Sequence, residues 1–287
     1  MADEHRDAVI NTYRHLRVGM IVVVSLLAAA VVTQGVGAGC WQTSISAYYF
    51  TSAHSVFVAV LCALGAMLIV YQGSSDTEDS VLNFSGFLAF IVAFTPTTRP
   101  LICGGSGIPD AYDVSPGVWN NVLAVVVVAI AADATRLLLK YKANPEMPLS
   151  RWAKVSIVVG YLMTGLGVIV FATDRDLFVD HGHTVAAVTM FIGIIIVILI
   201  NAWSARARVG AERFVRWYYA VAAFMAVALL TIVVTRFIDR GWRHLVMWLE
   251  VAVLVAFAGF WAVQTAELWR VVDRRELLPE GADPTGK

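Results

Sequence analysis

The chain has 287 residues, of which 59% are apolar and only 15% are charged, and its mean hydropathy is +0.73. A soluble domain of this size does not carry so much apolar surface, whereas a bundle of lipid-facing helices does. The formal net charge is zero, so no basic excess is available for binding nucleic acid. The composition predicts an all-α integral membrane protein whose main partner is the lipid bilayer, and it excludes a nucleic-acid-binding protein.

Apolar segments recur along the whole chain, and a segment needs about 20 helical residues to cross about 30 Å of hydrocarbon. Such spans are expected near residues 18–38, 53–72, 81–96, 118–139, 153–172, 183–203, 217–235 and 244–266. The third is the weakest, because Pro96 ends it early and Asn83 and Ser85 dilute its apolar character. The sequence therefore predicts a polytopic transmembrane helical bundle of about eight spans, with seven as the alternative.

The first span resembles a signal peptide at first sight, because Arg14 and Arg17 precede it and Cys40 follows it. It is long for a cleaved apolar region, and Gly37 stands where a lipoprotein signal carries a branched aliphatic residue. We expect this segment to remain in the protein as a membrane anchor.

The basic residues predict how the bundle is oriented. With eight spans, sixteen of the 21 Lys and Arg residues fall on the same side of the membrane as the two termini. The positive-inside rule places that side in the cytoplasm. We therefore expect a cytoplasmic N-terminal segment (1–17), a single transmembrane domain (18–266) and a cytoplasmic C-terminal tail (267–287), in the cell inner or plasma membrane.

The positions of the three cysteines allow two interpretations. Cys62 lies inside the second span and is most simply a small apolar residue, whereas Cys40 and Cys103 fall in loops on the predicted outer side. These two thiols either form a disulfide or stay free, because pairing needs a close approach of the two Cα atoms that the sequence does not give.

A polar and aromatic segment precedes the second span. It runs from Ser44 to His54 and places hydroxyls, phenols and an imidazole at a membrane boundary. Polar side chains are unfavourable in lipid and tend to line protein cavities. The segment is therefore expected to form one wall of a site. No Gly-x-Ser-x-Gly elbow accompanies its serines, so nucleophilic catalysis is not expected.

Other polar residues fall on the predicted outer side. They are Asp110 and Asp113, the loop 173–183, and Asp239 with His244. In this reading His54 and His183 each open a span at the same depth. On the opposite side, Asp133 with Arg136 and Glu267 with Arg270 have the i, i+3 spacing of structural ion pairs at helix ends.

Glu250 is the most informative single residue of the last span. It has apolar neighbours on both sides and would lie about 9 Å below His244 in a helix. An ionised carboxylate at that depth needs a cation, a hydrogen-bond donor or water. Glu250 is therefore either a ligand, proton or metal site, or one half of a structural pair with His54, His183 or an arginine.

The candidate ligand-binding residues follow from these observations. They are Ser44, Ser46, Tyr48, Tyr49, His54, His183 and Glu250. Imidazole and carboxylate are also the usual ligands of zinc, so a zinc site is the alternative. Its candidate ligands are His54, Asp180, His183 and Glu250. Because residues two apart do not share a helix face, only one of His181 and His183 is expected to join such a site.

Several motifs resemble a group of uncharacterised bacterial multispan membrane proteins. They are the run Ser44-Ile-Ser-Ala-Tyr-Tyr-x-Thr51, Val56-Phe-Val58, Leu61-Cys62, Asn83-x-x-Gly86, Phe94-Thr-Pro96, His183-x-x-x-Ala187, Trp248-Leu-Glu250 and Phe260-Trp261. The resemblance covers most of the chain and implies an outer polar site around Ser46, Tyr48, Tyr49, His183 and Glu250. The position of His54 is often arginine in that group, which favours a basic partner for a carboxylate over a metal ligand.

A remoter similarity, in architecture alone, is to the seven-span membrane hydrolases that include alkaline ceramidases and adiponectin-type receptors, although their Ser-x-x-x-His and His-x-x-x-His patterns are absent here. Two functions are therefore expected. The first is binding or transport of a small molecule, a lipid headgroup or an ion at the outer polar site. The alternative is metal-assisted hydrolysis of a lipid at the outer leaflet.

Overall fold

The computed structural model describes residues 2–97, 99, 103, 115–143, 149–208, 210–235, 244–272 and 274–277. These residues form eight α-helices and two short 3-10 helices and contain no strand, which confirms the all-α prediction. The long helices are α1 (Ala2–Ala38), α2 (His54–Val70), α3 (Asp76–Phe94), α4 (Ser115–Ala143), α5 (Arg151–Thr173), α6 (Arg175–Ala205), α7 (Glu212–Thr235) and α8 (Leu245–Glu267). The short ones are η1 (Ser46–Phe50) and η2 (Arg274–Leu277).

Six of the long helices are long and apolar enough to cross a membrane, namely α1, α3, α5, α6, α7 and α8. The other two apolar helices are shorter: α2 has 17 residues, and the apolar part of α4 is Pro116–Ala132. Seventeen helical residues rise about 26 Å, slightly less than the hydrocarbon thickness. The chain thus has the helices of a multi-pass membrane protein, with six spans by this criterion where the sequence predicted about eight.

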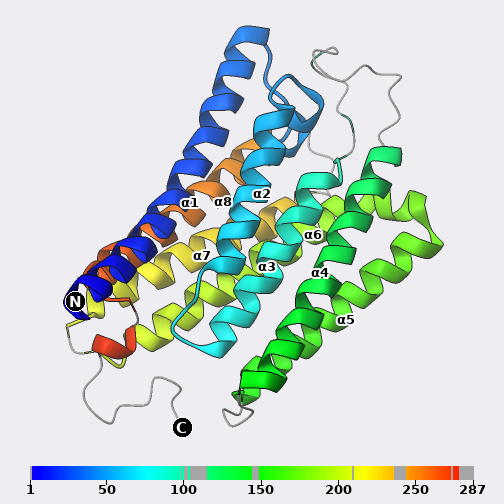
Figure 1. Ribbon diagram of the computed structural model, residues 1–287. Coiled ribbons are helices and arrows are strands. Elements are labelled where there is room, and N and C mark those ends of the chain that lie inside the picture. Colours follow the sequence, from blue (N-terminus) through cyan, green and yellow to red (C-terminus); the bar gives the residue numbers. More distant parts are fainter. Residues whose placement is uncertain are drawn as a thin grey trace.

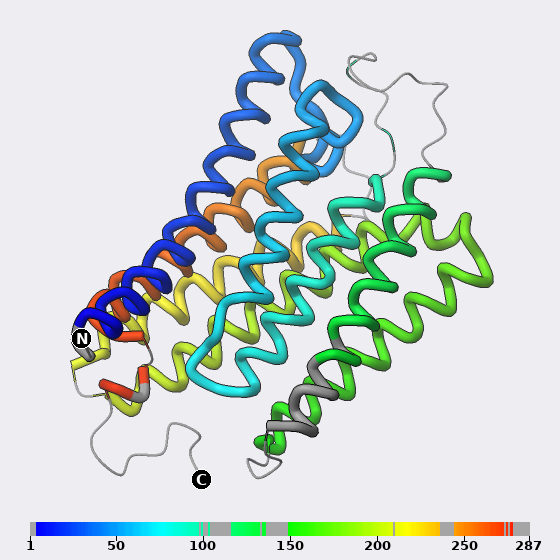
Figure 2. Tube along the Cα trace, in the orientation of Figure 1, coloured from blue at the N-terminus to red at the C-terminus, as the bar shows by residue number. Residues whose placement is uncertain are grey.

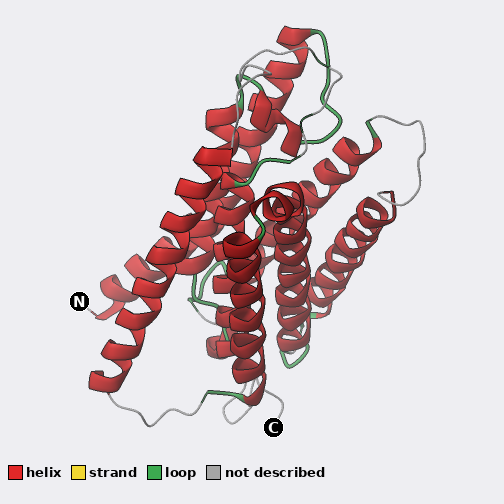
Figure 3. Cartoon of the chain, turned by 90° about the vertical axis from the view of Figure 1, so that its right-hand side faces the viewer, coloured by secondary structure: helices red, strands yellow, loops and turns green. Residues whose placement is uncertain are grey.

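Consecutive helices run in alternating directions between two ends of the bundle (Figure 1), and the described chain consists of helices joined by loops (Figure 3). In the packing order, α1 contacts α2 and α8, α3 lies against both α2 and α6, and α7 lies between α6 and α8. Helix α5 packs on α3 and α6, and α4 packs on α3, on the side of the bundle remote from α1 (Figure 1). Residues distant in sequence therefore meet around α3 and α6.

The described N-terminal and C-terminal residues lie at the same end of the bundle, as the Cα trace shows for the start of α1 and for η2 (Figure 2). Arg6 and Glu276 form a salt bridge of 2.7 Å there. We call this the terminal end, and the opposite end, where the segment between α1 and α2 lies, the η1 end.

Helices α3 and α6 begin at Asp76 and Arg175, before the spans predicted from 81 and 183, and each is capped by a polar residue that the sequence analysis left outside a span. Ser75 accepts a hydrogen bond from Glu78 N at the start of α3, and Asp174 accepts one from Leu177 N at the start of α6. Such caps satisfy amide groups that have no partner inside the helix. The expectation that residues 173–183 form a loop is therefore wrong. His183 does not begin a helix but lies in the third turn of α6.

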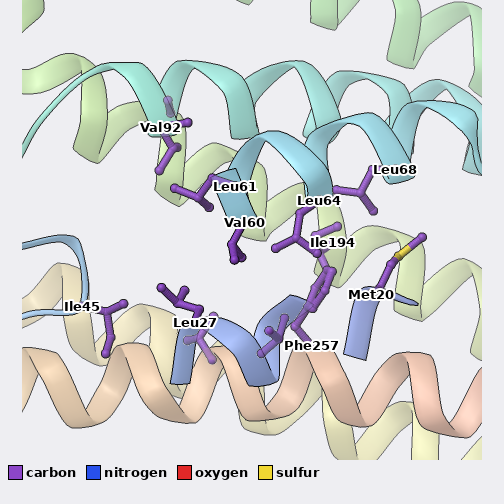
Figure 4. Close-up of a cluster of buried hydrophobic side chains, with 14 of the residues drawn as sticks. Met20, Leu27, Ile45, Val60, Leu61, Leu64, Leu68, Val92, Ile194 and Phe257 are labelled. Atoms are coloured by element: carbon purple, nitrogen blue, oxygen red, sulfur yellow. The ribbon is translucent and has the colours of Figure 1, made fainter. Parts of the chain in front are cut away.

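A continuous apolar core fills the bundle between α1, α2, α3, α6 and α8. Figure 4 shows Leu27, Leu64, Ile194 and Phe257 gathered in this core from four helices. Helices α2 and α3 come especially close where Gly65 faces Gly86, because a Cβ on Gly86 would lie 2.6 Å from the Gly65 carbonyl oxygen. Small residues at such crossings let helix backbones approach in membranes.

Candidate functional site at the η1 end

The segment between α1 and α2 folds into a compact, largely buried unit. Ser44 Oγ accepts a hydrogen bond from Ala47 N at 3.0 Å and so starts η1, and Thr51 Oγ1 donates to Tyr48 O at 2.9 Å at its end. Four of the five η1 residues are buried, including Tyr48 and Tyr49. Burial also raises the pKa of the Tyr48 phenol, which therefore stays neutral.

Glu250 reaches this segment from the second turn of α8. Its Oε2 accepts hydrogen bonds from Ile45 N at 2.5 Å and from Ser46 N at 3.3 Å. Two backbone N–H groups at the start of η1 thus stabilise the negative charge of the carboxylate. A carboxylate with apolar sequence neighbours needs hydrogen-bond donors, and these two amides provide them.

His183 joins the same segment from α6. Its Nδ1 lies 2.7 Å from Thr95 O and its Nε2 lies 2.9 Å from Ser46 Oγ. A carbonyl oxygen can only accept, so Nδ1 carries the proton, and in the neutral ring Nε2 accepts from the Ser46 hydroxyl. The imidazole is buried and links the end of α3 to η1.

Further contacts hold the segment on the bundle. Met247 N donates to Thr43 O at 2.9 Å, and His244 Nδ1 lies 3.1 Å from Gln42 O. Cys40 and Cys103 form a disulfide with their Cα atoms 6.0 Å apart, which is the first of the two readings that the sequence left open. Through these contacts the segment is held by α8 and by the residues that follow α3.

Ser46, His183 and Glu250 lie on the wall of one cavity of about 90 Å³. Apart from these three and Thr97 and Thr184, its wall is apolar and comes from α1, α2, α3, α6, α7 and α8. A volume of this size holds several water molecules or one small organic group. Three residues that the sequence singled out, at positions far apart in the chain, thus converge on one space.

The other predicted site residues lie around this cavity rather than in its wall. Ser44, Tyr48 and Tyr49 are buried within the folded segment. His54 begins α2, and its Nδ1 lies 2.6 Å from Tyr49 O while its ring packs edge-on against the Tyr49 ring. These residues shape the segment that carries Ser46.

Of the four candidate zinc ligands, His183 and Glu250 lie on the wall of this cavity and His54 and Asp180 do not. Asp180 and His181 are exposed near the start of α6, whereas His183, on another face of the same helix, is buried. His54 is directed to the Tyr49 carbonyl oxygen. Within the described ranges, no three His, Cys, Asp or Glu side chains are close enough together to hold a metal ion. Outside the described part of the chain lie Asp110, Asp113 and Asp239, and also the side chains of Asp133 and Arg136.

A second polar cluster, which the sequence did not predict, lies at the terminal end. We call it the Arg274 cluster; its members are Glu78, Asn201, Tyr218, Gln264, Glu267 and Arg274. The Arg274 guanidinium donates to both carboxylate oxygens of Glu267, at 2.9 and 2.6 Å, with the two side chains only 1% and 0% exposed. Tyr218 OH donates to Glu267 Oε2 at 2.6 Å. The expected pair of Glu267 with Arg270 is therefore wrong, and Arg270 is exposed.

Asn201 connects this ion pair to α3. Its Oδ1 accepts from Arg274 Nη2 at 2.9 Å and from Gln264 Nε2 at 2.8 Å, and its Nδ2 donates to Glu78 Oε1 at 2.7 Å. Burial would lower the pKa of Arg274, but the hydrogen bond and charge of Glu267 raise it above its ordinary value. The cluster thus joins α3, α6, α7 and α8 through hydrogen bonds between buried polar and charged side chains.

Arg17 makes a neighbouring connection to α1. It is 1% exposed, and it donates to Tyr71 OH at 3.0 Å and to Leu268 O at 3.1 Å. The sequence contains an indication of buried polar groups at the terminal end, because Glu78, Gln264 and Glu267 interrupt or flank apolar runs as Glu250 does. It gives no sign of their partners, because Arg274 follows the last span and its surroundings in the sequence predict an ordinary cytoplasmic tail.

No family model, curated protein or solved structure matches this chain.

Proposed function

We propose that this membrane protein binds or transports a small cation or amine in the cavity at the η1 end. The observation that carries the proposal is the convergence of Ser46, His183 and Glu250 on that cavity. A carboxylate on the wall of a cavity at a membrane boundary is a natural ligand for an ammonium group or another small cation.

The character of the wall supports a ligand of this chemistry. No Lys or Arg is among the described residues that line the cavity, and Glu250 is the one acidic group among them. The remaining wall is mainly aliphatic and aromatic, including Leu61, Phe191 and Leu254. An apolar pocket with a few directional polar groups is the usual form of a small-molecule site. A compact amine, including the amine of a lipid headgroup, fits this description.

The η1 end faces the outside of the cell in this proposal, with both termini in the cytoplasm and the protein in the cell inner or plasma membrane. The Cys40–Cys103 disulfide at the η1 end supports this orientation, because disulfides persist in oxidising compartments and are rare in the cytosol. The distribution of Lys and Arg supports it independently.

Thermal unfolding of the detergent-purified protein tests the proposal. We expect at least one of ammonium, methylammonium, ethanolamine and choline to raise the unfolding midpoint, since a ligand at about 100 times its Kd stabilises by about 2.7 kcal/mol. Glu250→Gln removes the charge while keeping the side-chain shape, so this variant should lose the response. Glu212→Gln, which changes an exposed acid in the first turn of α7, is the matched control and should keep it.

Two results would contradict the proposal. One is a wild-type midpoint that none of the four cations raises. The other is an equal rise in the wild type and in Glu250→Gln, since the cation would then act elsewhere on the protein. If a cation responds as expected, its uptake by proteoliposomes separates transport from binding.

A second candidate function is acyl transfer by Ser46, and it is favoured by the Ser46–His183 geometry. The 2.9 Å distance from Ser46 Oγ to His183 Nε2 is that of a nucleophile and its base, and Thr95 O orients the ring from the other nitrogen. Against it, the Ile45 and Ser46 amides, which could bind an oxyanion, both donate to Glu250. We therefore rank it second.

A fluorophosphonate probe, which reacts with activated serines, decides between the two candidates. Acyl transfer requires labelling of the wild type that disappears in Ser46→Ala and persists in Ser52→Ala, a change at an exposed serine of the same segment. A wild-type protein that the probe does not label rules the second candidate out and leaves the cation proposal intact.

A further inference from the structure

A larger cavity, of about 430 Å³, lies between α3, α4, α5 and α6 on the side of the bundle remote from α1. Its volume falls within the range of small-molecule pockets, roughly 300–1,000 Å³. It is separate from the η1-end site, since the two cavities have no lining residue in common. The cation proposal therefore does not account for it.

The cavity is elongated along the helix axes. On α6 its lining residues run from Leu177 to Thr189, and on α5 they run from Met163 to Phe171. The stretch on α5 corresponds to about 12 Å of helix, at about 1.5 Å per residue. Since helices that cross a bilayer lie roughly along its normal, a slot of this shape runs in the direction of the lipid chains.

The walls are apolar, and one side is open to the surroundings of the protein. The polar side chains among the lining residues are His181, Thr164 and Thr189. Leu166 and Val185 line the cavity and are nevertheless 63% and 58% exposed. In a membrane, the medium that meets such exposed leucine and valine side chains is hydrocarbon.

An arginine and the lining histidine lie where α6 begins. His181 lines this end of the cavity and is exposed. The Arg175 guanidinium lies 3.8 Å from the centre of the Trp119 ring, and that ring stacks on Phe171, a lining residue, at 4.4 Å. An arginine beside an aromatic ring at a helix boundary is a common partner for a phosphate oxygen.

The acidic residues of the same turns do not belong to the cavity wall. Asp174 caps α6 by accepting from Leu177 N. Asp176 and Asp180 are four residues apart and share a face of α6, and neither of them lines the cavity. His181 and Val185, also four apart, share the face that does. Arg175 does not line the cavity either, but its guanidinium lies on the Trp119 ring that stacks on the lining residue Phe171. An arginine and an imidazole therefore stand beside this end of the slot.

From this arrangement we infer that the slot binds one acyl chain of a phosphate-headed bilayer lipid. The chain lies along α5 and α6 between the apolar walls, and the phosphate lies at the level of Arg175 and His181. The acyl chain contacts apolar side chains and the phosphate contacts basic ones. The open side of the slot lets the chain enter laterally from the membrane.

Two glycines of α5 provide a matched pair of variants. Gly167 lines the slot and Gly165 does not, and a Cβ at either position would have no atom within 4 Å. Phenylalanine can therefore be introduced at both without a backbone clash. Gly167→Phe fills the slot, whereas Gly165→Phe adds the same side chain to an exposed face of the same helix. Val185→Trp is a second blocking variant, on α6.

The probe is a phosphatidylcholine with a diazirine near the middle of one acyl chain, added to the protein in dioleoyl phosphatidylcholine vesicles. After irradiation, mass spectrometry of peptides should find the label concentrated on the lining segments of α3, α5 and α6. Gly167→Phe and Val185→Trp should reduce labelling of these segments by about tenfold, which corresponds to about 1.4 kcal/mol of affinity. Gly165→Phe should label like the wild type.

Three results would overturn the inference. Equal labelling of Gly167→Phe and Gly165→Phe would show that the slot is not the site. Label spread evenly over the exposed faces of α7 and α8 would indicate ordinary surrounding lipid. Labelling by a diazirine fatty acid but not by the phospholipid would exclude a bilayer lipid as the occupant. Size-exclusion chromatography confirms that each variant is folded, and because two blocking variants lie on different helices, misfolding of one leaves the other to decide.

Discussion

Glu267 and Arg274 form an ion pair that is shielded from solvent on all sides, so each charge depends on the other. Removing one partner of a buried pair leaves an uncompensated charge and costs about 3–5 kcal/mol. We expect Glu267→Gln to lower the thermal unfolding midpoint of the purified protein strongly. Glu267→Gln combined with Arg274→Met should lose less than the single change, because the Arg274 charge is then no longer buried without Glu267.

The Arg6–Glu276 pair at the same end is the control. Its side chains are 59% and 32% exposed, and exposed pairs contribute less than about 1 kcal/mol. Arg6→Ala should therefore leave the midpoint almost unchanged. Equal losses in Glu267→Gln and Arg6→Ala would contradict the assignment of the buried pair as the main electrostatic contact of the terminal end.

Individual polar residues could be predicted where their neighbours in the sequence define their environment. Glu250 stands out because its neighbours are apolar, and the structure supplies the donors that such a carboxylate requires. Arg274 does not stand out, because its partners Glu267, Asn201 and Tyr218 are assembled by the packing of three helices. Spacing rules consider only neighbours within a turn, so they favour Arg270 as the partner of Glu267.

At the level of helices, the contact of α2 with α3 depends on two glycines. Gly86→Ala would place a Cβ 2.6 Å from the Gly65 carbonyl oxygen, so the helices must separate. We expect a loss of about 1–3 kcal/mol, the usual effect of overpacking, measured by thermal unfolding. Gly259→Ala in α8 meets no atom within 4 Å and should be neutral or stabilising, because alanine favours helix by up to about 1 kcal/mol.

The disulfide fastens the η1 segment to the residues after α3, and its removal should be measurable. It closes a sequence separation of 63 residues, for which we expect a contribution of about 2–4 kcal/mol. A reductant should therefore lower the unfolding midpoint of the wild type. Cys40→Ser should start from the lower midpoint and show no further response. If the mass of the protein after alkylation is the same with and without reductant, the disulfide is absent.

The positions of the helices were largely predictable, because a long apolar run in a membrane satisfies its backbone hydrogen bonds by forming a helix. Each predicted span coincides with a helix, and the differences lie at the ends. Helix α3 begins at Asp76 because Ser75 caps it and because acidic side chains in its first turn interact favourably with the positive end of the helix. In the sequence alone, a serine followed by acidic residues is equally typical of a loop. For the same reason the apolar pattern predicts a boundary at His183, which lies inside α6.

For the whole molecule, the structure places a cavity with polar groups at one end and a closed polar cluster at the other, with an apolar core between them. The Arg274 cluster ties α3, α6, α7 and α8 together, so any passage of a ligand to the terminal end would require these contacts to open. Binding at the η1 end requires no such change. A transported cation should therefore cross faster in Glu267→Gln if the cluster is the closed gate.

The proposed orientation has a direct test in intact cells. In a background with Cys62→Ala, which leaves the disulfide in place, single cysteines at Asp176 and at Asp7 report the two ends of the bundle, since both positions are exposed. A membrane-impermeant maleimide should label Asp176→Cys in intact cells, and Asp7→Cys only after permeabilisation. The reverse pattern would place both termini outside.

The disulfide also bears on how the protein is made. The helices that lie between Cys40 and Cys103 are α2 and α3, which cross the bundle in opposite directions. In the proposed orientation, with α2 and α3 both crossing the membrane, the two thiols reach the same side only after these helices have inserted as a hairpin. A chain in which α3 fails to insert would keep Cys103 on the side opposite Cys40 and remain reduced. In that orientation, oxidation of the Cys40–Cys103 pair would report that α2 and α3 have inserted together.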